Sequence, residues 1–219
     1  MGEAMDEIKA ALAGRWAALA AELKLTGDVA AAGGRIVDCY SQPHRRYHNL
    51  EHLQYCLRML DEVSASLKER AIVEAAIWFH DAVYVPGAQD NEANSAQWAR
   101  EVLTNLGLDA RRVERVASLV MSTDHRGRAN GHDARVLCDI DLSILGQPEE
   151  VYRRYAAAVR AEAGLEEREF NQRRIEFINW IVNRGPDRPL FHTEAFRSRL
   201  EAQAQANLRR ERDELQPPP

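Results

Sequence analysis

The stretch MDEIKAALAGRWAALAAELKL, residues 5–25, decides the fold class of this chain. Its large apolar residues recur at a spacing close to 3.6 residues: Ile8, Leu12, Trp16, Leu19 and Leu23. This spacing is the period of an α-helix that buries one of its faces. The stretch therefore predicts an amphipathic helix over residues 5–25.

Helical patterns continue along the rest of the chain, and strand signals are almost absent. Further helices are expected from Asp28 as N-cap to about Tyr40, from Asn49 as N-cap, and over 68–82, 166–183 and 193–214. No repeat, low-complexity linker or shift of composition divides them. We therefore expect one all-α domain over residues 1–214, with 215–219 as a flexible tail.

The composition is that of an ordinary soluble protein. Of 219 residues, 45% are apolar and 29% are charged, and 34 acidic residues outnumber 29 basic ones. This balance argues against a polyanion-binding surface, so no nucleic-acid partner is expected. No apolar run approaches the roughly 18 residues of a membrane span, and the first residues show no secretory signal pattern. We expect a cytoplasmic protein with no membrane partner.

The three cysteines, Cys39, Cys56 and Cys138, are scattered without the C-x-x-C spacing of redox or zinc sites. Each stands among apolar residues. They are therefore expected to be reduced core residues.

Two histidines and a carboxylate stand close together in RYHNLEH, residues 46–52. His48 and His52 are four residues apart and so share one face of a helix. Histidine is the side chain that most readily both binds metals and moves protons near neutral pH. The pair indicates a metal site or a proton-transfer site.

A second motif, WFHDA, places His80 and Asp81 at the end of the most apolar predicted helix. Adjacent helical residues point about 100° apart, so both side chains can reach one point only near a helix end. A bound metal ion would explain the pair, and a simple helix C-terminal cap is the alternative.

A third motif, CDIDLS, sets Asp139 and Asp141 in a helix of otherwise apolar residues. Aspartate is a poor residue for a helix interior and is rarely buried without a partner. At least one of the two carboxylates should therefore meet a cation, a solvated surface pair being the alternative. Together the three motifs predict one metal centre.

The order His52, then His80-Asp81, then Asp139 or Asp141 resembles the H…HD…D signature of the HD superfamily of metal-dependent phosphohydrolases. YHNLEH is similar to the YHNxxH motif of class I cyclic-nucleotide phosphodiesterases, and IDLS resembles their ADLS segment. In length and in sequence motifs, the chain most resembles small bacterial predicted HD phosphohydrolases. These share the motifs RYHNLxH, FHD, DNExxSA and DxDLxILG. The resemblance covers about residues 40–210.

This resemblance implies a single-domain HD-type helical bundle that holds one or two divalent metal ions. It implies that His48 is the catalytic proton donor and that the metal ligands are His52, His80, Asp81 and Asp141, with Asp81 also counted as catalytic. The chain departs from the phosphodiesterases where HDAVY replaces their HDxxH, and no purine-gripping glutamine can be placed. A substrate other than a cyclic nucleotide is therefore expected, and the second metal is left open.

The chemistry of this ligand set favours hydrolysis. Two imidazoles and two carboxylates suit Mn, Fe, Co, Ni or Zn better than Ca or Mg. Such an ion would activate a water molecule, while protonated His48 would protonate the leaving oxygen. The expected contacts to substrate phosphate are Arg46, His125, Arg126 and Arg160, although each arginine could instead form a surface salt bridge.

Four carboxylates are expected to support the ligands from outside the metal shell: Glu51, Asp90, Glu92 and Asp139. For two of them the alternative is a purely structural role at the start of a helix. Asp90 would be the N-cap, and Glu92 in the first turn would suit the helix dipole.

The sequence thus predicts a metal-dependent phosphohydrolase that cleaves a phosphoester or phosphoanhydride bond in a small, nucleotide-like substrate, acting as a monomer or homodimer. One alternative is an inverted zinc peptidase, because HNLEH matches H-x-x-E-H, with Glu51 as general base. The other is a non-catalytic helical module that keeps the metal for stability or ligand sensing. His48 distinguishes the last alternative, since a purely structural site would not need a proton donor.

Overall fold

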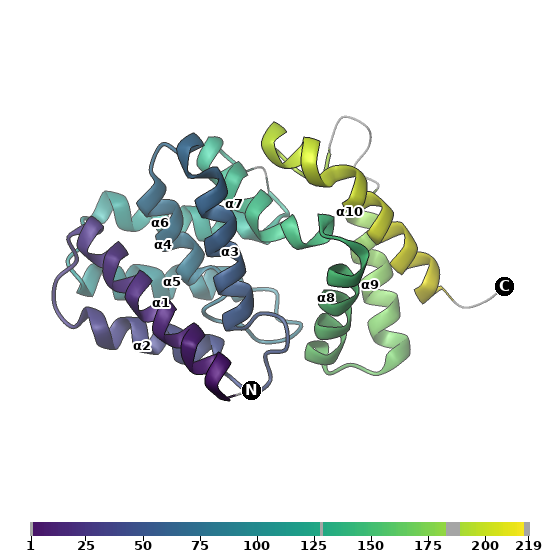
Figure 1. The fold of residues 1–219 in the computed structure, drawn as a ribbon, viewed down its shortest axis with the longest axis horizontal. Coiled ribbons are helices and arrows are strands. Elements are labelled where there is room, and N and C mark those ends of the chain that lie inside the picture. The colour runs from purple at the N-terminus through teal and green to yellow at the C-terminus, as the bar shows by residue number, and fades with distance from the viewer. Residues whose placement is uncertain (1, 128, 183–188, 217–219) are drawn as a thin grey trace. The chain divides into compact units, whose positions relative to one another are not determined.

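The computed structural model describes residues 2–127, 129–182 and 189–216, which form α-helices and short 3-10 helices with no strand among them (Figure 1). This confirms the expected all-α class. Contacts within the chain define two compact units, Met1–Leu137 and Cys138–Pro219, and α7 (His132–Leu142) runs through the boundary. One domain over 1–214 stays a prediction. Of the expected tail, Leu215 ends a helix and 217–219 lie outside the described residues.

The first unit is built around one apolar helix. Its complete helices are α1 (Gly2–Leu23), α2 (Val29–Tyr40), α3 (Leu50–Val63), α4 (Arg70–Phe79), α5 (Asn91–Asn105) and α6 (Ala110–Met121). Helix α4 packs against α1, α3, α5 and α6 (Figure 1). Every residue from Ile72 to Phe79 is buried, as expected of a helix that is apolar on nearly all sides. Of the residues that follow α4, His80 and Ala82 are also buried.

Close packing of α1 and α2 brings Trp16 into this core. The Trp16 ring lies edge-on to that of Trp78, with 5.4 Å between the ring centroids, and its Nε1 donates to the Val29 carbonyl. Gly33 on α2 makes the approach possible, because a Cβ atom there would lie 2.4 Å from the Trp16 ring. The apolar spacing that predicted a helix over 5–25 thus corresponds to a real buried face, on a helix that ends at Leu23.

Local capping fixes where the helices of the first unit begin. The side chains of Asp28 and Asn49 accept hydrogen bonds from backbone N–H groups of α2 and α3, as expected from the sequence. The buried carboxylate of Asp133 accepts hydrogen bonds from the N–H groups of Lys68 and Glu69 at the start of α4. Helix α4 is shorter than the expected 68–82, and His80 is its C-cap.

The second unit contains α8 (Glu149–Ala163), α9 (Glu167–Val182) and α10 (Glu194–Leu215). Helix α10 packs against α9 and against a short 3-10 helix, η3 (Ser143–Gly146). Inside the unit the guanidinium of Arg174 pairs with the carboxylate of Glu211 at 3.0 Å, and the hydroxyl of Tyr152 donates to the same carboxylate. Since these charged groups are buried, each needs the others to remain there.

Asp139, near the end of α7, anchors the start of α10. Its buried carboxylate accepts hydrogen bonds from the His192 N–H at 2.6 Å, the Thr193 N–H at 2.7 Å and the Thr193 hydroxyl at 2.6 Å. Burial raises the pKa of Asp139 to about 6, although the three hydrogen bonds act in the opposite direction. Asp139 is thus ionised at neutral pH and placed where the helix dipole favours a negative charge.

Substitution Asp139→Ala is expected to lower the free energy of unfolding by about 3 kcal/mol, because it leaves buried backbone donors without an acceptor. Chemical denaturation followed by circular dichroism would measure the loss. Glu150→Ala is the matched control, since Glu150 makes only an exposed ion pair with Arg154. Equal stability of the two variants would contradict the anchoring role.

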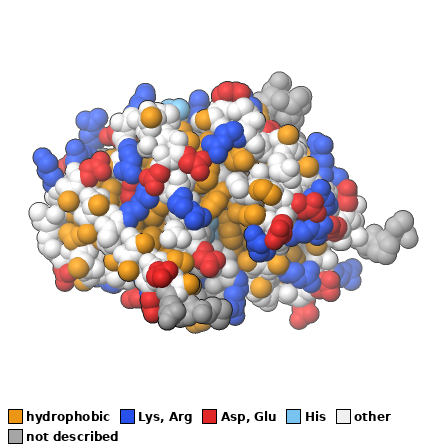
Figure 2. Space-filling view, viewed as in Figure 1, with side chains coloured by type: hydrophobic (Ala, Val, Ile, Leu, Met, Phe, Trp, Pro, Cys, Tyr) orange, Lys and Arg blue, Asp and Glu red, His pale blue; other side chains and the backbone are white. Residues whose placement is uncertain are grey.

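The surface carries both signs of charge. Figure 2 shows Lys and Arg side chains interspersed with Asp and Glu over the face in view, in keeping with the mixed composition of the chain. None of the described helices combines the length and the apolar character that crossing a membrane requires.

Candidate metal centre

Three side chains of the first unit converge where α3 begins and α4 ends. The Nε2 atoms of His52 and His80 lie 3.0 Å apart. Oδ2 of Asp81 lies 3.3 Å from His52 Nε2 and 3.0 Å from His80 Nε2. Both histidines are buried, and the Asp81 side chain is 15% exposed. Three potential ligand atoms, two nitrogens and one oxygen, therefore surround one point.

Local structure aims each histidine at that point. Nδ1 of His80 lies 2.8 Å from the carbonyl oxygen of Ile77, which can only accept, so Nδ1 carries the proton and Nε2 presents its lone pair. The backbone N–H of His52 donates to the side-chain oxygen of Asn49, which caps α3. A backbone carbonyl that fixes the tautomer of a histidine in this way is typical of metal sites.

The charge of Asp81 suits the same site. Burial by itself would raise the pKa of Asp81, but the nearby His80, His48 and His52 outweigh it. The pKa is held well below its usual value, so Asp81 is an anion. An anionic oxygen beside two imidazoles is a donor set that a divalent metal ion matches.

The spacing of these atoms also fits a metal ion. Ligands about 2.0 to 2.2 Å from one ion lie roughly 2.8 to 3.6 Å from each other, the shorter separations in octahedral and the longer ones in tetrahedral geometry. The three observed separations, 3.0, 3.0 and 3.3 Å, fall in this interval. The residues present therefore fit a divalent metal.

A fourth potential donor in the first unit was not foreseen from the sequence. The thiol of Cys56 is buried, with Sγ 3.7 Å from His52 Nε2, and the donor atoms of His52, Cys56 and His80 all lie within 4.8 Å of one another. The sequence analysis expected Cys56 to be a core residue. The available signal was its spacing, since residues 52 and 56 are four apart and share a helix face.

His48, the predicted proton donor, lies beside the cluster. Its ring centroid is 5.7 Å from that of His52, and its ring stacks on Tyr84 with 4.2 Å between centroids. The His48 side chain is half-buried, whereas Glu51 on the first turn of α3 is exposed. His48 is thus beside the three ligands and still reachable from solvent.

Arg45 is the second residue that the sequence analysis missed, because the arginine it singled out in this loop was Arg46. Arg45 is buried between the rings of Tyr40 and Tyr84. Its guanidinium donates to the carbonyls of Asp81 at 2.6 Å, Ala82 at 2.9 Å and His48 at 3.1 Å. It therefore joins the backbone of His48 to the backbone of Asp81 and Ala82, while Arg46 is exposed.

Substitution Arg45→Lys is expected to lower metal affinity by about 10- to 100-fold, the range found when a group that supports metal ligands is lost. Lysine keeps the charge but cannot reach three carbonyls with a planar fork. Competition with a chromogenic chelator would measure the affinity. The neighbouring Arg46→Lys is the matched control and should change the metal affinity little. Equal losses of affinity in the two variants would show that the contacts of Arg45 to the three carbonyls do not support the site.

The loop that follows Asp81 is held by α5. Side-chain atoms of Asn91 exchange two hydrogen bonds with the backbone of Val85, and Ser95 does the same with Val83. Asp90 is the N-cap residue of α5, but it is exposed and its side chain makes no capping hydrogen bond. In the DNExxSA motif, Asn91 and Ser95 therefore have the clear structural roles.

Glu92 faces the same region as the ligands. Burial raises the pKa of Glu92, the negative charges of Asp81 and Asp124 raise it further, and Arg126 lowers it. Asp81, Glu92, Asp124 and Arg126 thus lie within electrostatic reach of one another. Arg126 is exposed and its Nη2 donates to Gln89 at 2.6 Å, while His125 before it has a left-handed backbone with φ of 54°.

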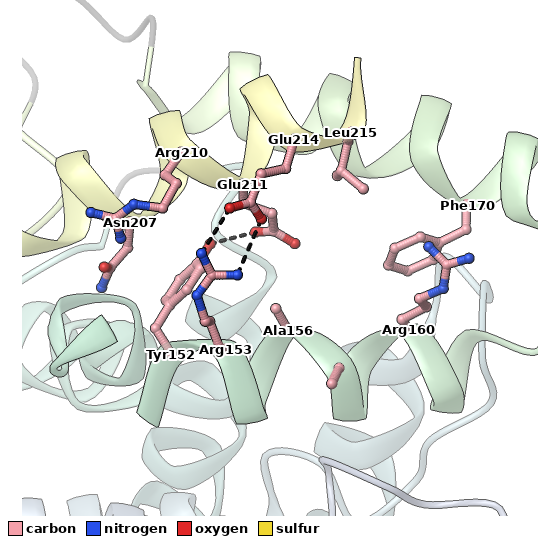
Figure 3. Close-up of a pocket in the computed structure, with 11 residues that line it drawn as sticks. Tyr152, Arg153, Ala156, Arg160, Phe170, Asn207, Arg210, Glu211, Glu214 and Leu215 are labelled. Atoms are coloured by element: carbon pink, nitrogen blue, oxygen red, sulfur yellow. Dashed lines mark hydrogen bonds and ion pairs between the residues drawn. The ribbon is translucent and has the colours of Figure 1, made fainter. Parts of the chain in front are cut away.

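Three of the predicted site residues belong to the second unit. Asp139 anchors α10, and both of its carboxylate oxygens accept hydrogen bonds from residues 192 and 193. Asp141 lies in the last turn of α7 and remains, of the two aspartates, the predicted metal ligand. Arg160 lies on α8 at a pocket of about 200 Å³, with its guanidinium beside the Phe170 ring (Figure 3) and ion-paired with Glu167. Its described contacts correspond to the salt-bridge alternative.

Comparison of the chain with family models, curated proteins and solved structures gives no match. The functional assignment therefore rests on the residues and the geometry of the first unit.

Proposed function

We propose that this protein is a metal-dependent phosphohydrolase acting on a small, nucleotide-like phosphoester or phosphoanhydride. The observation that carries the proposal is the convergence of His52 Nε2, His80 Nε2 and Asp81 Oδ2 within 3.0 to 3.3 Å of one another. The order of these residues along the chain is that of the H…HD…D signature. Asp141 is proposed as a further ligand on the same resemblance.

The metal would be held by His52, His80 and Asp81, with nitrogen and oxygen donors that suit Mn, Fe, Co, Ni or Zn. When bound there it would supply a Lewis acid that polarises phosphoryl oxygens and lowers the pKa of water. Asp81 keeps its negative charge, and His80 keeps its lone pair aimed at the cluster through its bond to Ile77. Both residues are thus prepared to bind without rearrangement.

His48 would act as the general acid. Stacking on Tyr84 and the hold of Arg45 on the His48 carbonyl restrict its position. The negatively charged Asp81 lies near His48, and a protonated imidazole at this position could deliver a proton to the leaving oxygen. Arg126 is proposed as a phosphate contact, because its charge lies near Glu92, which in turn lies near Asp81.

A phosphate-release screen tests the proposal. Wild-type protein loaded with Mn²⁺, Co²⁺ or Zn²⁺ is incubated with a panel of nucleotides and small phosphate esters, and inorganic phosphate or nucleoside is measured. We expect release from at least one substrate, loss of release with a chelator, and none from Asp81→Ala. His44→Ala is the control for an exposed histidine of the same loop. Turnover equal in wild type and Asp81→Ala would contradict the proposal.

A further inference from the structure

We propose that the thiolate of Cys56 is a ligand of this metal centre, which makes the site selective for Zn²⁺, Co²⁺ or Fe²⁺ over Mn²⁺ and Mg²⁺. The inference rests on the proposed metal centre and goes beyond it, because the His and Asp ligands alone do not strongly separate Zn²⁺, Co²⁺ and Fe²⁺ from Mn²⁺. Sulfur donors select softer metals, whereas oxygen donors suit Mg²⁺ and Mn²⁺.

The position of Cys56 is set by helix α3. Cys56 follows His52 by four residues, so both side chains project from the same face, toward the end of α4. Its Sγ lies 3.7 Å from His52 Nε2 and 3.8 Å from His52 Nδ1. Every pair of donor atoms among His52, Cys56 and His80 is within 4.8 Å. The sulfur thus borders the same small space as the two imidazoles.

These separations suit a shared ion. With bonds of about 2.3 Å to sulfur and 2.0 to 2.1 Å to nitrogen, tetrahedral geometry places the two donors roughly 3.5 Å apart. The 3.7 Å between Cys56 Sγ and His52 Nε2 matches this separation, but Sγ also lies 3.8 Å from His52 Nδ1, so the Cys56 side chain must rotate toward the Nε2 side to bind the same ion.

A thiolate at Cys56 would need a cation beside it. The side chain is 1% exposed, and a buried thiolate is costly unless a positive charge compensates it. A divalent ion at the cluster is the compensating charge, since a coordinating thiol is deprotonated by the metal.

Titration with Co²⁺ alone tests the proposal without any substrate. Cobalt bound by nitrogen and oxygen gives visible d–d bands, and a bound thiolate adds a sulfur-to-cobalt charge-transfer band in the near ultraviolet. We expect both in the wild type, and loss of only the charge-transfer band in Cys56→Ser. The double variant Cys39→Ala/Cys138→Ala leaves Cys56 as the single cysteine and should keep both the d–d bands and the charge-transfer band. The test therefore does not depend on the folding of Cys56→Ser.

Selectivity gives a second readout. Cys56→Ser should weaken Zn²⁺ binding by about 100-fold and Mn²⁺ binding much less, which lowers the ratio of the two affinities. Visible d–d bands without a charge-transfer band in the wild type would overturn the role of Cys56 and leave the proposed function standing. Absence of all cobalt bands would overturn both the Cys56 ligand and the metal centre.

Discussion

Substitution His80→Ala is expected to remove the tightly bound metal from the protein and to abolish metal-dependent turnover. His80 supplies an Nε2 lone pair whose direction is fixed by the hydrogen bond from Nδ1 to Ile77, and alanine supplies no donor. We expect metal affinity to fall by on the order of 10³-fold or more, beyond the 10- to 100-fold loss typical of residues that only support ligands. Metal analysis after purification without chelators would measure the change.

The His80→Ala result needs a control for folding, because His80 is buried at the end of the central helix. Circular dichroism should show that the helical content is retained, and His52→Ala should reproduce the loss of metal. His44→Ala alters an exposed histidine and should keep the full metal content. Normal metal content in both His80→Ala and His52→Ala would show that these imidazoles are not ligands.

Substitution His48→Ala should leave the metal content unchanged and lower turnover by on the order of 10² to 10⁴, the usual contribution of a general acid. His48 lies beside the cluster, but its closest described ring contact is the stacked Tyr84, whereas His52 contacts His80 and Asp81. The rate should also lose the dependence on pH that reports protonation of His48. Metal content and turnover, measured on the same preparation, separate the two roles.

Glu51→Gln provides the opposite test. In an inverted zinc peptidase, Glu51 would be the general base and His48 a zinc ligand, so Glu51→Gln would abolish peptide cleavage and His48→Ala would lose the metal. In the phosphohydrolase, the exposed Glu51 at the first turn of α3 should matter far less. Loss of metal in His48→Ala would therefore favour the peptidase.

The helical fold was predictable because its signals are local. Apolar residues at the helical period mark buried faces, and Asp28 and Asn49 are side chains that cap helices in any context. The end of α4 was less predictable. The apolar pattern continues into Ala82, but the chain leaves the helix after Phe79, and the carbonyls that follow are bound by Arg45.

The site was predictable where the residue types themselves carry the chemistry. The structure brings His52, His80 and Asp81 together, as the motifs suggested. Cys56 was missed because a buried cysteine is more often a core residue than a ligand. Arg45 was missed because a loop has no periodicity, so the sequence could not show which of two adjacent arginines turns inward.

The two aspartates of CDIDLS illustrate a different limit. Their spacing of two residues shows that they point in different directions, but not which one meets a metal. The carboxylate of Asp139 binds the backbone at residues 192 and 193, more than 50 positions along the chain. No local pattern reveals such a contact. The structure settles the role of Asp139, and Asp141 stays a prediction.

The metal centre is tested most directly by anomalous X-ray diffraction from crystals grown with Co²⁺ or Zn²⁺, with data on both sides of the absorption edge. We predict one strong anomalous peak within about 2.0 to 2.2 Å of His52 Nε2, His80 Nε2 and an oxygen of Asp81. A peak bound by His48 and His52 with His80 and Asp81 remote from it, or no peak near these residues in crystals that bind the metal elsewhere, would contradict the metal centre and the function proposed from it.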